Sequence, residues 1–204
     1  MAKIGLFSGS FNPVHLGHVH LAEYLLEQTD IQELWLVVSP CNPLKQSTEL
    51  LDQGLRLRMV ELAIEHNPRL RASDFEFDMP QPSYTIDTLE ALAAHYPEHE
   101  FSLIIGEDNW LLFHKWKDYK RILEDFSIIV YPRNSSAELF LSNALAYLRQ
   151  LDVPVSMQGQ YFIDAPLFPI SSTEIRSLLA QKKSATQYLN PSVAQYIATL
   201  SLYE

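Results

Sequence analysis

The sequence predicts an α/β protein of the Rossmann-like, doubly wound type, with a parallel sheet and a small C-terminal helical part. Two observations lead to this fold class. Short apolar runs alternate with longer stretches of helical period along most of the chain. Such alternation implies right-handed crossovers between parallel strands. In addition, clusters of polar residues directly follow several of the predicted strands, as expected where a parallel sheet carries a ligand site at its carboxyl edge.

The first predicted strand contains Ile4, Leu6 and Phe7 and runs into a turn-rich loop over residues 8–13. A helix follows, because apolar residues recur three, four, seven and eight positions after His18. The further expected strands are 33–39, 70–77, 101–105, 126–131, 153–157 and 161–163. The further expected helices are 55–64, 84–95, 110–123 (mixed), 137–151, 172–181 and 191–203.

Composition limits the classes of function. The chain has 204 residues, of which 47% are hydrophobic, enough for one domain over 1–204 with a helical portion from about 171 packed on it. A net charge of −10 argues against a nucleic-acid surface, and no apolar run is long enough to span a membrane. The single Cys41 excludes a disulfide framework and indicates a reducing, cytoplasmic setting. Whether the chain forms a homo-oligomer stays open.

The loop after the first strand has the features of an anion site. Gly9 and the small residues beside it let the backbone approach a phosphate, and the following helix points its first N–H groups there. His15 and His18 are three apart, so they share one face, whereas His20 points elsewhere. The loop contains neither a dinucleotide-binding fingerprint nor a Walker motif, and no third ligand supports a metal pair.

A second group of donors lies at residues 170–176, at the start of a predicted helix. Ser171 and Glu174 form a capping box, which explains the helix start but not Arg176. Arg176 lies one helical turn after Ser172 and Thr173, so its guanidinium shares a face with their hydroxyls. Such a set of donors suits a triphosphate.

These segments resemble a known family. GSFNPVHLGH (9–18) and ISSTEIR (170–176) are similar to the two signatures of nucleotidyltransferases with a His-x-Gly-His motif. PSYTIDTL (82–89) and IIGEDNWLLFHKW (104–116) resemble segments of the bacterial nicotinate-nucleotide adenylyltransferase family. The resemblance runs from residue 4 to about residue 180, with the motifs in the same order and at similar spacing.

The resemblance implies transfer of AMP from ATP to nicotinate mononucleotide, with Mg²⁺ accompanying ATP. It also implies the site. Catalysis is expected from His15, His18 and Arg176. ATP is expected to bind Gly9, Ser10, Phe11, His15, His18, Gly106, Asp108, Ser172, Thr173 and Arg176. The second substrate is expected to bind Lys45, Tyr84, Thr85, Trp116 and Arg133, with the Trp116 indole stacking on the pyridine ring. The loop of Lys45 departs from the family pattern by one residue fewer after Asn42-Pro43.

Other functions remain open at this stage. An adenylyltransferase could prefer the amide mononucleotide, since the difference is a single charge. A phosphopantetheine enzyme explains neither residues 83–88 nor Trp116. A non-catalytic nucleotide sensor would be marked by loss of a phosphate ligand, but His15, His18 and Arg176 are all present. An RNA-directed role lacks the basic surface that it needs.

Overall fold

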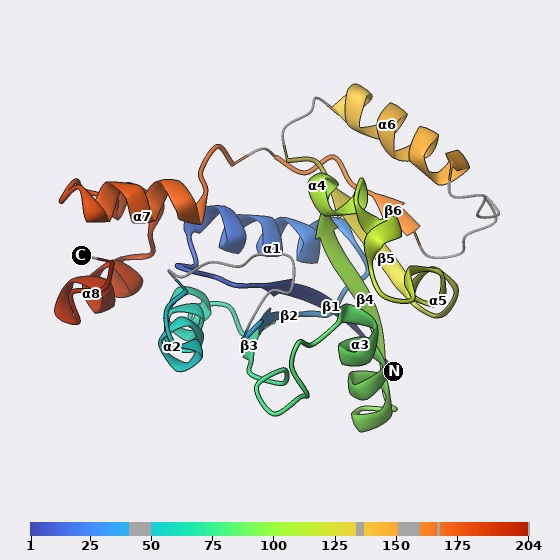
Figure 1. Ribbon diagram of the computed structural model, residues 1–204, viewed down its shortest axis with the longest axis horizontal. Helices are drawn as coiled ribbons and strands as arrows, with labels where there is room; N and C mark the ends of the chain where they lie inside the picture. Colours follow the sequence, from blue (N-terminus) through green and yellow to red (C-terminus); the bar gives the residue numbers. More distant parts are fainter. Residues whose placement is uncertain (41–49, 134–136, 151–159, 167, 204) are drawn as a thin grey trace.

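The structure, a computed structural model, describes residues 1–40, 50–133, 137–150, 160–166 and 168–203. Lys45 and the expected strand 153–157 lie outside these residues. Six parallel strands form one sheet in the order β3-β2-β1-β4-β5-β6 (Figure 1). They are β1 (Ala2–Gly9), β2 (Glu33–Val38), β3 (Leu70–Ser73), β4 (His99–Gly106), β5 (Ser127–Tyr131) and β6 (Gln160–Phe162). This confirms the Rossmann-like parallel sheet.

Helices connect the strands and cover both faces of the sheet. They are α1 (Leu16–Gln28), α2 (Gln53–Ile64), α3 (Thr85–His95), α4 (Glu107–Trp110), η1 (Phe113–Lys115), α5 (Tyr119–Asp125), α6 (Ala137–Gln150), α7 (Ser172–Ala180), η2 (Thr186–Tyr188) and α8 (Pro191–Thr199). The strand order reverses between β1 and β4, which makes their carboxyl ends the switch point where such sheets bind ligands.

The largest differences from the sequence prediction concern three of the predicted elements. The strand expected over 70–77 ends at Ser73, because the chain turns and the Phe77 N–H donates to the carbonyl oxygen of Asp74 (2.8 Å). The helical stretch over 110–123 is divided into α4, η1 and α5, with Asp118 at a left-handed φ of 48° before α5. The last helix stops at Thr199 instead of 203. There Ser201 takes φ 48° and the Leu202 N–H donates to the Ile197 carbonyl oxygen.

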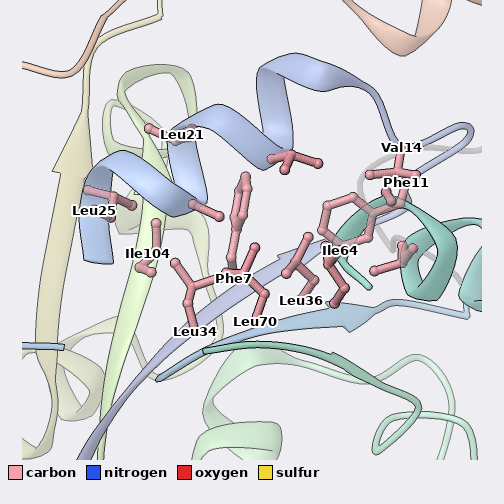
Figure 2. Packing of buried hydrophobic residues seen from close by; sticks show 14 of the residues in the cluster. Phe7, Phe11, Val14, Leu21, Leu25, Leu34, Leu36, Ile64, Leu70 and Ile104 are labelled. Carbon is pink, nitrogen blue, oxygen red and sulfur yellow. The ribbon is translucent and has the colours of Figure 1, made fainter. Parts of the chain in front are cut away.

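Two hydrophobic clusters lie on opposite faces of the sheet, and alternate strand residues divide between them. In β2, Leu34 and Leu36 belong to one cluster, whereas Trp35 and Val37 belong to the other. The first cluster contains Leu21, Leu25 and Phe11 (Figure 2) and also receives α2, α7 and α8. The second receives α3 to α6. The C-terminal helices therefore share the core of α1 and α2.

The buried face of α2 includes a charged residue. Leu55 and Leu62 are only half-buried, and the fully buried positions are Arg56, Met59 and Val60, followed by Ala63. These positions follow the i, i+3, i+4, i+7 pattern. An arginine therefore stands inside the core, on the same face as the buried apolar residues of the helix.

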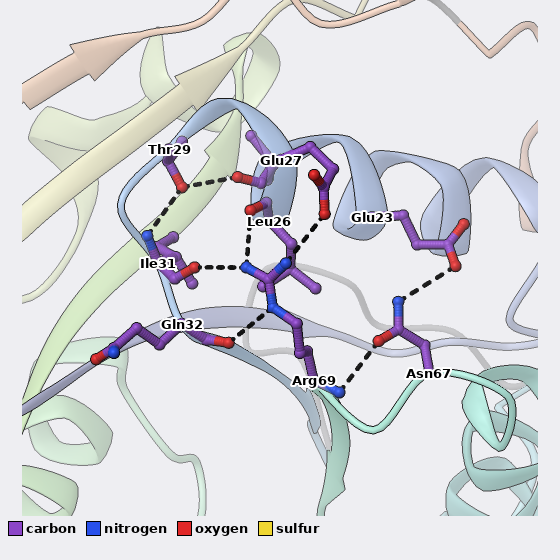
Figure 3. A network of polar contacts seen from close by, with 9 residues as sticks. Glu23, Leu26, Glu27, Thr29, Ile31, Gln32, Asn67 and Arg69 are labelled. Atoms are coloured by element: carbon purple, nitrogen blue, oxygen red, sulfur yellow. Dashed lines mark hydrogen bonds and ion pairs between the residues drawn. The ribbon is translucent and has the colours of Figure 1, made fainter.

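A polar network holds the α1–β2 connection against β3 (Figure 3). The Arg69 guanidinium donates to the backbone carbonyl oxygens of Leu26, Ile31 and Gln32 and pairs with Glu27 (3.0 Å). These contacts lie at the start of the strands, away from the carboxyl edge.

None of the helices among the described residues has the length and apolarity required to cross a bilayer.

Candidate active site

A cavity of about 390 Å³ opens at the carboxyl edge of the sheet, over the point where β1 and β4 diverge. Its size is within the usual range for a small-molecule site. Polar segments that are far apart in the chain meet there, as the convergence of polar clusters predicted. Its lining includes Gly9, Ser10, Phe11, His15, His18, Tyr84, Thr85, Gly106, Asp108, Trp116, Arg133, Ser172, Thr173 and Arg176.

The β1–α1 loop, residues 10–13, forms one wall of the cavity. Phe11 takes a left-handed φ of 44° although it is not glycine, and its side chain is buried against Phe7 with ring centroids 5.7 Å apart. Gly9 precedes this turn, and a Cβ there would meet the Phe11 ring at 3.2 Å. The two residues together turn the loop so that Ser10, Phe11 and Asn12 face the cavity.

The two histidines lie side by side at the start of α1, as their spacing predicted. Their ring centroids are 3.7 Å apart with the planes inclined by 28°. His20 is exposed and lies near Phe168. Burial, reinforced by the Arg133 charge, lowers the pKa of His15 to about 4. Burial, followed by the His15 and Arg133 charges, lowers the pKa of His18 well below its ordinary value. Both imidazoles are therefore neutral at pH 7.

The protonated nitrogen of His18 follows from its hydrogen bond. The backbone N–H of His15 donates to His18 Nδ1 (3.2 Å), so Nδ1 carries no proton. A neutral imidazole has one N–H, which in His18 must then be Nε2–H. His18 consequently offers a hydrogen-bond donor, and not a base, at Nε2.

The N-terminus of α7 forms the wall beside the β1–α1 loop. Ser171 caps the helix with the predicted capping box, since its hydroxyl accepts from the Glu174 N–H (3.2 Å) and Glu174 accepts from the Ser171 N–H (2.9 Å). The Ser172 hydroxyl donates to the Pro13 carbonyl oxygen (2.9 Å), and Arg176 Nη1 donates to that of Asn12 (2.8 Å). Two residues expected to meet phosphates thus also contact the loop backbone.

Asp108 and Arg133 form an ion pair at the wall of the cavity. Arg133 Nη1 lies 3.1 Å from Asp108 Oδ2, and both side chains are about half-exposed. Gly106, the residue before α4, leaves room for them. A Cβ on Gly106 would lie 2.7 Å from Asp108 Oδ1 and 3.0 Å from Arg133 Cδ. The glycine is required here by close approach, and its φ of −76° is open to any residue.

The remaining wall comes from the N-terminus of α3 and from η1. Tyr84 precedes α3 and Thr85 begins it, so the N-terminal end of this helix lines the cavity. Trp116 ends η1, packs on Phe113 (ring centroids 5.1 Å apart) and also lines the cavity. Lys117 Nζ lies 5.0 Å from the centre of the Tyr84 ring. The predicted roles of these residues toward a substrate stay predictions.

Sequence reasoning missed several residues that build this site. Glu76 is buried and accepts from the hydroxyls of Ser83 (3.1 Å) and Thr88 (3.0 Å), which anchors the start of α3. Arg56 and Tyr203 donate hydrogen bonds to the β1–α1 loop, although neither is among the described residues that line the cavity. An arginine at an apolar-face position of α2 was a signal that the sequence offered. The roles of Glu76 and Tyr203 depend on tertiary contacts, which no periodic pattern in the sequence indicates.

The comparisons with known proteins agree with this geometry. A family model described as cytidylyltransferase-like matches residues 6–178 of the chain. A protein of Bacteroides thetaiotaomicron named "probable nicotinate-nucleotide adenylyltransferase" is 47% identical over 195 residues, which cover 96% of this chain and 90% of that protein. The chain belongs to the nicotinate-nucleotide adenylyltransferase family.

Further members and solved structures extend the likeness. A family member from Flavobacterium johnsoniae is 43% identical over 207 residues, covering 99% of both chains. In fold, the chain resembles the Plasmodium falciparum nicotinic acid mononucleotide adenylyltransferase complexed with NaAD, with a TM-score of 0.78 and 21% identity. The likeness covers 100% of this chain and 98% of that one. The family resemblance seen in the motifs is thereby confirmed.

Proposed function

We propose that this protein transfers the AMP group of ATP to nicotinate mononucleotide, giving nicotinate adenine dinucleotide and pyrophosphate in NAD biosynthesis. Membership of the adenylyltransferase family supports the reaction. One structural observation carries it: donors from the β1–α1 loop, α1 and α7 surround a single cavity at the switch point of the sheet. The enzyme is thus a nucleotidyltransferase, and the single cysteine supports a location in the cytosol.

In this reaction a phosphate oxygen of nicotinate mononucleotide attacks the α-phosphorus of ATP. A new P–O bond forms, the bond from the α-phosphorus to the bridging oxygen breaks, and pyrophosphate leaves with the electron pair. The attacking oxygen is already anionic, so the enzyme needs no general base. Its work is to align the two groups and to stabilise the charge that develops on the phosphates.

The donors of the site fit this task. His18 presents Nε2–H and Arg176 a fixed positive charge, both on the walls of the cavity. Ser172 and Thr173, at the start of α7, line the same cavity, and the N–H groups of a first helical turn have no acceptor within the helix. We assign the β- and γ-phosphates to the α7 side and the α-phosphate to His18 and the β1–α1 loop. In this assignment Asp108 meets the ribose and Arg133 meets a phosphate.

Mg²⁺ enters as part of the MgATP substrate in this proposal. The cavity wall is rich in N–H and O–H donors, and none of the described residues gather into a group of three metal-ligating side chains. The phosphate oxygens and water are the natural ligands of this ion, which keeps much of its hydration. Magnesium would reduce the charge on the triphosphate while the chain holds the remaining oxygens.

The α3 side of the cavity favours a substrate with a carboxylate. The N-terminus of α3 carries a partial positive charge, and Tyr84 and Thr85 at this end line the cavity. Lys117 stands beside Tyr84, but it is paired with Asp87 (2.8 Å) and adds no net charge there. Nicotinate offers an anion to this end, whereas nicotinamide does not. Trp116 packs against Phe113 and also lines the cavity. We therefore place the pyridine ring against Trp116.

Pyrophosphate release tests the substrate assignment directly. ATP is supplied with nicotinate mononucleotide, nicotinamide mononucleotide or phosphopantetheine in parallel assays. We expect the highest kcat/KM with nicotinate mononucleotide. Trp116→Ala should raise the KM for this substrate about tenfold, the scale of one stacking contact, and leave the KM for ATP unchanged. Equal rates with all three acceptors would contradict the proposal. A higher kcat/KM with nicotinamide mononucleotide would favour the amide-preferring enzyme, and no release with any acceptor would favour the sensor.

A further inference from the structure

We propose that Arg56 and Tyr203 are positioning residues that hold the β1–α1 loop in its ATP-binding shape from the side opposite the cavity. The proposal rests on the proposed function, because it takes the loop to be a phosphate-binding element. Ser10, Phe11 and Asn12 line the cavity, and among its described lining residues neither Arg56 nor Tyr203 is found. The two side chains act on the site only through the loop.

The loop requires such support because of its backbone. Phe11 stands in the left-handed region at φ 44°, which a bulky L-residue adopts only when the surroundings impose it. The side chain is buried and packs against Phe7 and His18. Packing alone fixes the ring, but the loop carbonyl groups also need donors. Side chains of α2 and α7 donate to these carbonyl groups, and Tyr203, after α8, donates to the Asn12 side chain.

Arg56 joins the loop to the end of β2. Its side chain is fully buried, and Nη1 donates to the carbonyl oxygens of Ser10 (2.6 Å) and Ser39 (2.8 Å). Nη2 donates to Pro40 (3.2 Å) and Nε to Leu51 (2.9 Å). A planar guanidinium can bridge such acceptors, because its N–H groups point in fixed directions. A lysine in its place has one nitrogen and cannot reach all of them.

Tyr203 holds the next loop residue from the segment after α8. Its hydroxyl donates to Asn12 Oδ1 (2.8 Å), although the two residues are 191 positions apart in the sequence. Asn12 Oδ1 also accepts from the Leu51 N–H (3.5 Å), and Arg176 binds the Asn12 carbonyl oxygen. Tyr203 itself has a left-handed φ of 68°. Burial raises the pKa of Tyr203, so its hydroxyl keeps its proton and remains a donor.

Residue Tyr203 gives the cleaner test, because Tyr203→Phe removes only the hydroxyl and keeps the ring in the core. The matched control is Tyr24→Phe, which removes a tyrosyl hydrogen bond of similar length (2.9 Å, to the Asp164 carbonyl oxygen) away from the loop. Binding of ATP alone is measured by calorimetry, and kcat and KM are measured for each substrate. Melting temperatures report the fold.

We expect Tyr203→Phe to weaken ATP binding and to lower kcat/KM for ATP by about fivefold, the scale of one hydrogen bond. The KM for nicotinate mononucleotide should stay near the wild-type value, and the melting temperatures of Tyr203→Phe and Tyr24→Phe should fall by no more than a few degrees, the scale of one hydrogen bond. The ATP affinity and kinetic constants of Tyr24→Phe should match wild type. In an Asn12→Ala background, Tyr203→Phe should have no further effect on ATP binding, because the acceptor is gone. Arg56→Lys should weaken ATP binding more than Tyr203→Phe does.

Three outcomes would overturn the proposal. Tyr203→Phe could bind ATP as wild type does, could lose both substrates equally together with its melting temperature, or could act additively with Asn12→Ala. If Arg56→Lys does not fold, the Tyr203→Phe results decide whether the loop needs this support.

The positioning proposal and the proposed function can be contradicted independently. If the protein does not turn over nicotinate mononucleotide, only the proposed second substrate is contradicted. The ATP affinities of the variants would still show whether Arg56 and Tyr203 hold the loop.

Discussion

The imidazole rings of His15 and His18 stack with centroids 3.7 Å apart, and the His15 backbone N–H donates to His18 Nδ1. This arrangement decides what His18 can do. With Nδ1 occupied as an acceptor and the pKa of His18 lowered by burial, the ring presents Nε2–H to the cavity as a neutral donor. This geometry suits His18 to hydrogen bonding with an anion rather than to proton transfer.

His18→Ala removes that donor. We expect kcat to fall by ~10²–10³, as when one donor to a developing oxyanion is lost, while the fold stays intact. Steady-state pyrophosphate release measures kcat, and circular dichroism reports the fold. His20→Ala is the control, since His20 is exposed on another side of α1. Near-normal turnover of His18→Ala would remove His18 from the mechanism.

His15→Asn should change the pH dependence of stability. The unfolded imidazole binds a proton below its ordinary pKa of 6.5, whereas the folded one stays neutral down to a pKa of about 4. The unfolded state then binds more protons, so stability is lost as pH falls from 6.5 through about 4. From pH 7 to pH 5 this amounts to about 2 kcal/mol.

Urea unfolding at pH 7 and at pH 5 measures this loss of stability on acidification. Wild type should lose more stability on acidification than His15→Asn, by about the same 2 kcal/mol. His20→Asn, at the exposed neighbouring histidine, should keep the wild-type difference. An equal loss in wild type and His15→Asn would mean that His15 is not held neutral in the fold.

Gly106→Ala should reduce activity with little effect on stability. The new Cβ would lie 2.7 Å from Asp108 Oδ1, and that carboxylate can move away by rotation. The movement breaks its pairing with Arg133, so we expect kcat/KM for ATP to fall about tenfold, as for one charge-assisted hydrogen bond. In an Asp108→Ala background the same substitution should have a much smaller effect. Equal effects in the wild-type and Asp108→Ala backgrounds would show that Gly106→Ala does not act by displacing the Asp108 carboxylate.

Thr88→Val tests the anchor of α3. Valine keeps the shape of threonine but removes the hydroxyl that donates to Glu76 Oε1 (3.0 Å), leaving a buried carboxylate oxygen short of a donor. We expect a loss of about 1–2 kcal/mol in the free energy of unfolding and a higher KM for nicotinate mononucleotide. Thr186→Val, at an exposed hydroxyl in η2, is the control. An unchanged KM would mean that α3 keeps its place without Glu76.

Much of the fold followed from periodicity in the sequence. The apolar run of β2 and the helical face of α1 predicted elements whose bounds differ from the observed ones by only a few residues. Local signals failed where the chain bends within a pattern. Asp118 divides one predicted helical stretch, and Ser201 ends the last helix early. Both residues take left-handed φ values, which residue type alone does not predict.

The sequence by itself determined which chemistry gathers at the carboxyl edge. Each motif carries its own local order: a glycine turn before α1, histidines one helical turn apart, and a capping box at Ser171. All of the site residues named in advance line the cavity, apart from Lys45, which is outside the described residues. Short spacing along a strand or helix suffices to predict such groupings.

Only the tertiary structure decided what holds these motifs in place. Arg56, Glu76 and Tyr203 contact their partners through packing of elements that no sequence interval relates, as with the 191 residues between Asn12 and Tyr203. Burial decided the protonation of His15 and His18, because the pKa of an imidazole depends on the desolvation and charges around it. Residue type supplies the donor, and the packed neighbours set its direction and charge.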